Sequence, residues 1–179
     1  MARIALSERR LPEARATAQK AFALAGEIRS TAIEAKITLG LAQALSGAVR
    51  QGQLNCQEGL EMARQADDPS LLSEALLALA EAKIQSGDTA GALKGSLEAQ
   101  ELFARFGKQD YEWIAWLIAA RASRSAGDIQ KARQYGSSAE NLLSGLQQKF
   151  GKDNYNTYLN RPDVQFSRKQ LSELIAGKT

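Results

Sequence analysis

The phrase Gly-Asp-x-x-x-Ala occurs twice in this chain, at residues 87–92 and, forty residues later, at 127–132. Each copy lies between segments whose apolar residues recur every three or four positions, the spacing of an amphipathic helix. Glycine accepts the left-handed conformation that ends a helix, and Asp accepts hydrogen bonds from the free N–H groups that begin the next one. A recurrence at this distance predicts repeated helix pairs joined by tight turns.

Small residues seven positions apart extend this repeat along the chain. Such pairs begin at Ala14, Cys56, Ala92 and Ala132 and end at 21, 63, 99 and 139. Residues seven apart share one helix face, so each pair forms a smooth stripe that a neighbouring helix can approach closely. We expect the stripes on helices at about 12–28, 54–66, 89–106 and 129–149, with preceding helices at about 31–50, 70–86 and 110–126.

Two segments, LALAEAKIQSGDTAGALKGSLEA (77–99) and WLIAARASRSAGDIQKARQYGSSA (116–139), resemble the tetratricopeptide repeat. That repeat has a helix A, a Gly-Asp turn and a helix B with small residues. The resemblance covers about residues 1–149 and implies an all-α, right-handed α-solenoid of antiparallel helix pairs. The spacing of 36 to 42 residues exceeds the family's period of about 34, which implies longer helices. The aromatic residue that the family places between the helix-B alanines is replaced by Ala18, Leu60, Ser96 and Gly136.

The predicted organisation is a series of repeats followed by a different tail. Residues 1–11 supply only the end of a first helix, so we expect the chain to be part of a larger protein. Gly47 and Gly52 can each end a helix, which leaves the register of residues 40–55 open. The expected units are a partial repeat at 1–29, repeats at 30–69, 70–109 and 110–150, and a tail at 151–179, in which an irregular connection leads to a closing helix at about 163–175 over the edge of the last repeat.

Aromatic residues give expectations about the core. Helical spacing places Trp116 on the core side of its helix and leaves Trp113 partly exposed. Tyr155 and Tyr158 are expected to hold the tail against the last repeat. The tail phrase YLNRPDVQFSRKQLSEL is similar to the segment that closes repeat arrays in some large multidomain bacterial signalling proteins.

The composition argues against catalysis. The chain has no histidine, which removes the commonest general base and metal ligand. Its single cysteine, Cys56, cannot build a thiolate zinc site and occupies a small-residue packing position. The carboxylates lie at helix ends, where capping and the helix dipole explain them. We therefore expect no enzymatic activity, no metal and no cofactor.

Charge and cysteine content limit the partners and the compartment. The net charge is +3, too small to favour nucleic acid, although it divides into +4 over 1–56, −6 over 57–112 and +5 over 113–179. No apolar run reaches the ~18 residues of a membrane span, and the N-terminus lacks a signal-peptide core. One cysteine permits no internal disulfide, and the expected location is the reducing cytoplasm.

The remaining candidate surface lies on the first helices of two repeats. In tetratricopeptide arrays these helices line the concave groove, so the resemblance assigns to it one face with Leu77, Glu81 and Ile84 and another with Leu117, Arg121 and Arg124. The two arginines are one turn apart and spaced to clamp a carboxylate or phosphate, although ordinary solvated charge explains them too. Chaperone-binding members use a Lys/Asn/Arg clamp, but leucines 77 and 117 occupy the clamp positions, so that function does not transfer.

The expected function follows from this surface. We expect a non-catalytic protein–protein interaction scaffold that binds a peptide or partner helix in the concave groove. The alternative is a sensory, regulatory or oligomerisation domain of a bacterial signalling protein, which would bind a small ligand or associate with itself.

Overall fold

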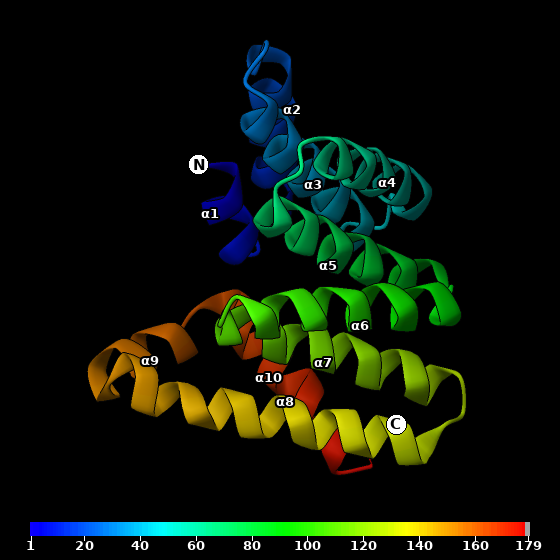
Figure 1. Ribbon diagram of the computed structural model, residues 1–179, viewed down its shortest axis with the longest axis vertical. Coiled ribbons are helices and arrows are strands. Elements are labelled where there is room, and N and C mark those ends of the chain that lie inside the picture. The colour runs from blue at the N-terminus through cyan, green and yellow to red at the C-terminus, as the bar shows by residue number, and fades with distance from the viewer. Residues whose placement is uncertain (178–179) are drawn as a thin grey trace.

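The computed structural model describes residues 1–177, which form ten α-helices. Each helix contacts the next one along the chain (Figure 1). The helices are α1 (Ala2–Ser7), α2 (Leu11–Leu24), α3 (Arg29–Leu45), α4 (Val49–Gln65), α5 (Pro69–Ser86), α6 (Thr89–Arg105), α7 (Gln109–Ser125), α8 (Ile129–Phe150), α9 (Lys152–Leu159) and α10 (Pro162–Ile175).

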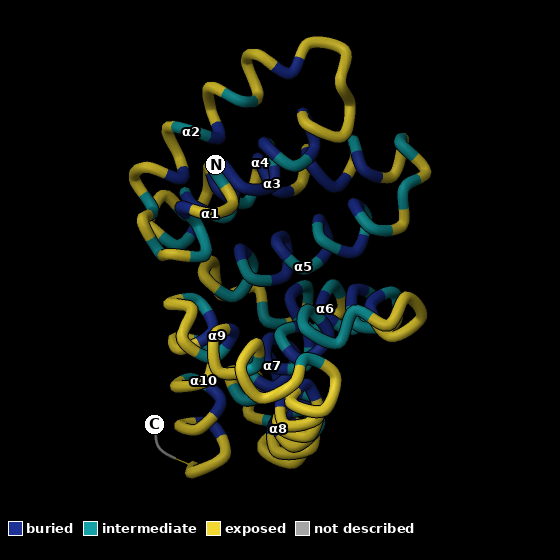
Figure 2. Tube along the Cα trace, turned by 90° about the vertical axis from the view of Figure 1, so that its left-hand side faces the viewer, coloured by how far each residue is buried: buried dark blue, intermediate teal, exposed yellow. Residues whose placement is uncertain are grey.

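The first eight helices form a sequence of antiparallel neighbours. The odd-numbered helices also contact one another, α1 with α3, α3 with α5 and α5 with α7. The even-numbered helices α2 to α8 make no comparable contacts among themselves within residues 1–177. The odd helices therefore form the closer layer, and the others lie outside it (Figures 1 and 2).

A residue with positive φ marks each of the seven turns from α1 to α8. Five of them are glycine, at 26, 47, 87, 107 and 127. From residue 26 to residue 127 the positive-φ residues, with Asp67 among them, are about twenty residues apart, which matches the helix lengths and the forty-residue period of the pairs. Gly87, with φ of 81°, ends α5 in the left-handed conformation, as the sequence predicts.

Aspartates begin three of the helices. Asp88 accepts from the Gly91 amide at 2.9 Å and Asp128 from the Lys131 amide at 3.0 Å, which confirms the predicted caps. Asp68 caps α5 in the same way, with Pro69 at its first position.

The small-residue stripes are contact surfaces. Of the eight stripe residues, only Ala21 keeps part of its surface in solvent, because α2 lies at the end of the array. Gly40 and Gly52 bring α3 and α4 still closer, since a Cβ at Gly52 would lie 2.4 Å from the Ala44 nitrogen. This contact resolves the register of 40–55, because Gly47 follows the end of α3 while Gly52 lies within α4.

Two expectations are wrong, the partial exposure of Trp113 and the irregular start of the tail. Trp113 is completely buried. Trp116 packs against the same core cluster, as expected, but keeps part of its surface exposed and stacks on Tyr135 with ring centroids 5.3 Å apart. The expected irregular connection after residue 151 is largely helix α9. The two differences meet at Tyr158 of α9, which lies in the same core cluster as Trp113 and accepts a hydrogen bond from its buried indole N–H at 2.6 Å.

The last helix covers more than the end of the array. Leu174 lies so close to Gly136 that a Cβ there would be 3.0 Å from its methyl carbon, so α10 packs on α8 as expected. Helix α10 also contacts α7 and α1. The C-terminal helix thus returns across the odd-numbered layer and meets the first helix of the chain.

Candidate binding cavity

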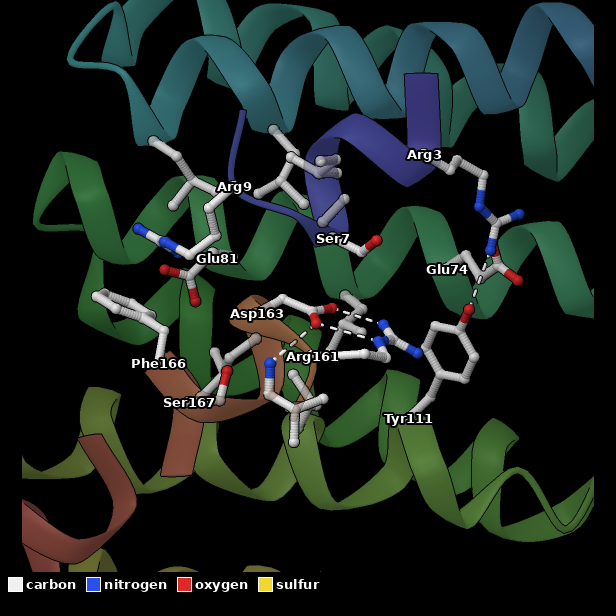
Figure 3. A pocket seen from close by; sticks show the side chains of 18 of the residues that line it. Arg3, Ser7, Arg9, Glu74, Glu81, Tyr111, Arg161, Asp163, Phe166 and Ser167 are labelled. Atoms are coloured by element: carbon white, nitrogen blue, oxygen red, sulfur yellow. Dashed lines mark hydrogen bonds and ion pairs between the residues drawn. The ribbon is translucent and has the colours of Figure 1, made fainter. Parts of the chain in front are cut away.

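A cavity of about 530 Å³ lies between the odd-numbered layer and the two ends of the chain (Figure 3). Helices α3, α5 and α7 form its walls and floor, and α1, α10 and Tyr158 of α9 complete the lining. The cavity exists because α10 and α1 approach each other over a layer that would otherwise be an open groove.

The inner wall is largely apolar. Each helix of the closer layer presents aliphatic side chains at helical spacing, because the face that packs on the next helix continues around into the cavity. These side chains are Ile37, Leu41, Leu77, Ile114 and Leu117.

An ion pair crosses this wall. Arg121 on α7 donates to the Glu81 carboxylate on α5 at 2.6 Å, and both side chains are about 15% exposed. Limited water around the pair strengthens the attraction. The pair joins the first helices of two consecutive helix pairs, α5 and α7.

A second polar group occupies the end of the cavity near Tyr111 (Figure 3). Arg3 on α1 lies 3.2 Å from the Glu74 carboxylate and 3.7 Å from that of Glu34, and it donates to the Tyr111 hydroxyl at 3.0 Å. Burial raises the pKa of Glu74, and the Arg3 charge opposes this effect. Burial and the Glu74 charge also raise the pKa of Tyr111. This network holds α1 against α5 and α7.

The other end is closed by a contact between Arg9 and Phe166. The Arg9 guanidinium lies over the Phe166 ring, 3.6 Å from its centroid, and faces the cavity beside Glu81 (Figure 3). Arg9 is in the turn after α1 and has φ of 57°. Phe166, on α10, is 40% exposed and lies at the rim. This contact joins residues 157 positions apart in sequence, and it links the turn after α1 to α10 across the cavity.

Hydrogen bonds of Arg161 and Tyr158 fix the start of α10. Arg161 binds Asp163 through two hydrogen bonds, at 3.1 and 2.6 Å. Tyr158 donates to the Asp110 carbonyl at 3.1 Å and accepts from Trp113, so the expected attachment of the tail by Tyr158 is confirmed. These bonds set the direction in which α10 leaves α9.

The structure separates the sequence-predicted site residues into two groups. Leu77, Glu81, Leu117 and Arg121 line the cavity, although Leu117 is only 1% exposed. Ile84 and Arg124 lie outside its lining. Arg121 and Arg124 therefore do not face the cavity together, and Arg121 already binds a carboxylate.

Other cavity residues come from segments that the sequence did not indicate. Arg3 and Arg9 belong to a segment read as an incomplete helix, and Phe166 to a helix expected only to cover an edge. The helical spacing of apolar residues cannot predict a contact between residues 9 and 166. One local signal existed: Arg9 stands at a turn position where the chain elsewhere has mostly glycine.

Comparison with known proteins gives no family. No protein-family model matches the chain, and no curated protein matches it significantly. Among residues 1–177, no cluster of three or more His, Cys, Asp or Glu side chains is arranged to hold a metal ion. Within the same residues, no helix has the length and apolar character needed to cross a membrane.

Proposed function

We propose that this protein is a non-catalytic binding module whose cavity takes a short extended segment of a partner protein. The observation that carries this proposal is the cavity of about 530 Å³, which has an apolar inner wall and several charged groups in its lining. Pockets of about 300–1,000 Å³ with a few placed polar groups are typical of ligand sites. A whole helix about 10 Å wide requires an open groove, so the closure by α1 and α10 favours an extended segment over a partner helix.

The architecture supports a repeat protein of the tetratricopeptide type. The forty-residue period, the closer odd-numbered layer and the small-residue stripes are the features of such an array. We assign the chain to that class as a right-handed solenoid with longer helices, working in the reducing cytoplasm because its single cysteine is buried and unpaired.

Selection from a random peptide library on the immobilised full chain tests the proposal. We expect enriched peptides with apolar side chains that compete with one another for one site. Ala78→Phe adds bulk at a buried alanine of the cavity wall and should weaken their binding at least tenfold. Ala90→Phe, on the exposed start of α6, is the matched control and should bind like the wild type. Equal binding by all three proteins, each shown to be folded by thermal melting, would contradict the proposal.

A small-molecule regulatory domain is the second candidate. The observation that favours it is the closure of the cavity by both ends of the chain, which couples occupancy to the position of α10. A thermal-shift screen with small molecules tests this version, and hits that Ala78→Phe abolishes would support it.

Self-association is the remaining version of the alternative. Exposed apolar side chains at the α2 end of the array favour it, among them Leu24 (84% exposed) and Ile28 (62%). Light scattering tests it, and a molar mass that stays monomeric at all concentrations would exclude it.

A further inference from the structure

Arg9 occupies a position that glycine fills in most turns of this fold. Seven turns between α1 and α8 contain a residue with positive φ; five are glycine, and the others are Arg9 and Asp67. Left-handed backbone is costly for residues with a Cβ, although the short polar Asp tolerates it. Arginine has no such local reason. The conformational cost of left-handed backbone at Arg9 therefore suggests a role for its side chain.

That side chain is a cation at the rim of the cavity. Of the four arginines in the lining, Arg3, Arg121 and Arg161 have carboxylates within 4.0 Å. Within residues 1–177, no carboxylate lies this close to Arg9, whose guanidinium stacks on the Phe166 ring. A guanidinium stacked on a ring keeps its N–H groups, which point outward in its plane, available for an acceptor.

The charges of the cavity are unequally distributed between its two ends. Near Phe166, Glu81 is neutralised by Arg121, so Arg9 contributes one net positive charge. At the other end, Arg3 and Lys108 balance the carboxylates of Glu34 and Glu74. Asp110, next to Tyr111 in the lining, leaves that end with one net negative charge. Between the two ends lie the apolar wall and the Arg161–Asp163 pair, whose charges cancel (Figure 3).

We infer that the occupant of the cavity is an elongated apolar group that ends in a carboxylate, with the carboxylate on Arg9. This inference rests on one part of the proposed function, that the cavity is the binding site, and it specifies the chemistry of the occupant. A planar guanidinium matches a carboxylate through two parallel hydrogen bonds. The apolar part lies along Leu77 and Ile114, away from the negative end. Both the C-terminus of an apolar peptide and a medium-chain fatty acid have this chemistry.

Calorimetric titration of the full chain with four probes tests the inference. The probes are octanoate, 1-octanol, acetyl-Leu-Leu-Phe as the free acid, and the same peptide as its amide. We expect at least one acid to bind tenfold or more tightly than its neutral counterpart, with the preference falling as salt is added. The tighter of the two acids identifies the source of the ligand.

Variants assign the preference to Arg9. Arg9→Gln should abolish it, Arg9→Lys should keep part of it, and Arg133→Gln, on an exposed face of α8, should leave it unchanged. Phe166→Leu removes the stacked ring but keeps the charge and should retain the preference. If it abolishes the preference as fully as Arg9→Gln, closure rather than charge is responsible, and the inference is overturned.

Three further results would overturn it: equal binding of acids and neutral probes, a preference that survives in Arg9→Gln, or no binding of any probe. The proposed function is judged separately, because library peptides that lose affinity in Ala78→Phe would support it even if no carboxylate preference exists.

Discussion

Glu81 and Arg121 occupy equivalent positions on α5 and α7, forty residues apart, and they bind each other at 2.6 Å. The sequence shows them as a difference between two copies of a repeat. The structure shows that these two residues contact each other. An acidic residue on α5 and a basic one on α7 hold two helices of the closer layer together at the wall of the cavity.

This pair should contribute measurably to stability. Glu81→Gln and Arg121→Gln each leave a partly buried charge without its partner, so each should lower the free energy of unfolding by about 1–3 kcal/mol. The double variant should cost less than the two single changes added together. Urea denaturation measures all three. The exposed Lys94–Glu98 pair is the control, and its loss should cost under about 0.5 kcal/mol; equal costs for the two pairs would contradict the expectation.

The turn glycines should differ from glycines inside helices. Gly127 has φ of 84° and Gly145 lies within α8, and neither has an atom within 4 Å of the place a Cβ would take. Gly127→Ala should therefore destabilise the protein by about 1 kcal/mol through backbone conformation alone. Gly145→Ala should stabilise it by about 0.5–1 kcal/mol. Thermal unfolding compares them, and a shift of the same sign for both would refute the turn assignment.

Much of this fold was predictable because its signals are local. The helix ends at Gly87 and Gly127 and the caps at Asp88 and Asp128 depend on residues within one turn of each other. The small-residue stripes are equally local, and they correctly indicated the buried faces. Helices α3 to α8 therefore agree with expectation to within a few residues, apart from the uncertain stretch that Gly40 and Gly52 explain.

The cavity was only half predictable, because its other half depends on packing over long distances. Leu77, Glu81, Leu117 and Arg121 were found from helical spacing. Arg9 and Phe166 lie at opposite ends of the chain, and their meeting depends on the direction of α10. That direction is fixed by Tyr158 on α9, a helix that was not predicted because its sequence is rich in asparagine.

The Tyr158 hydroxyl should be required for this arrangement. It accepts from the buried Trp113 indole at 2.6 Å, and without it the indole N–H loses its partner. Tyr158→Phe should lower the free energy of unfolding by about 1–3 kcal/mol. Tyr155→Phe, on the same helix, should change it by under about 0.5 kcal/mol. A cost in chemical denaturation no larger for Tyr158→Phe than for Tyr155→Phe would show that the bond does not matter.

The single thiol should be inert in the folded protein. Burial raises the pKa of Cys56 to about 12, so at pH values near 8 almost none of it is the reactive thiolate. Ellman's reagent should therefore label the native protein very slowly and the urea-unfolded protein at the rate of a free cysteine. Rapid labelling of the native state would mean that the α3–α4 contact opens.

The central claim is that the cavity is the binding site, and isoleucine methyl NMR tests it directly. Ile37, Ile114 and Ile118 line the cavity, whereas Ile28 and Ile129 are exposed outside it. Titration with a peptide enriched in the library selection should shift the methyl signals of the three cavity isoleucines and leave the two outer ones unchanged. Shifts confined to Ile28 or Ile129, with the cavity signals unmoved, would contradict the account.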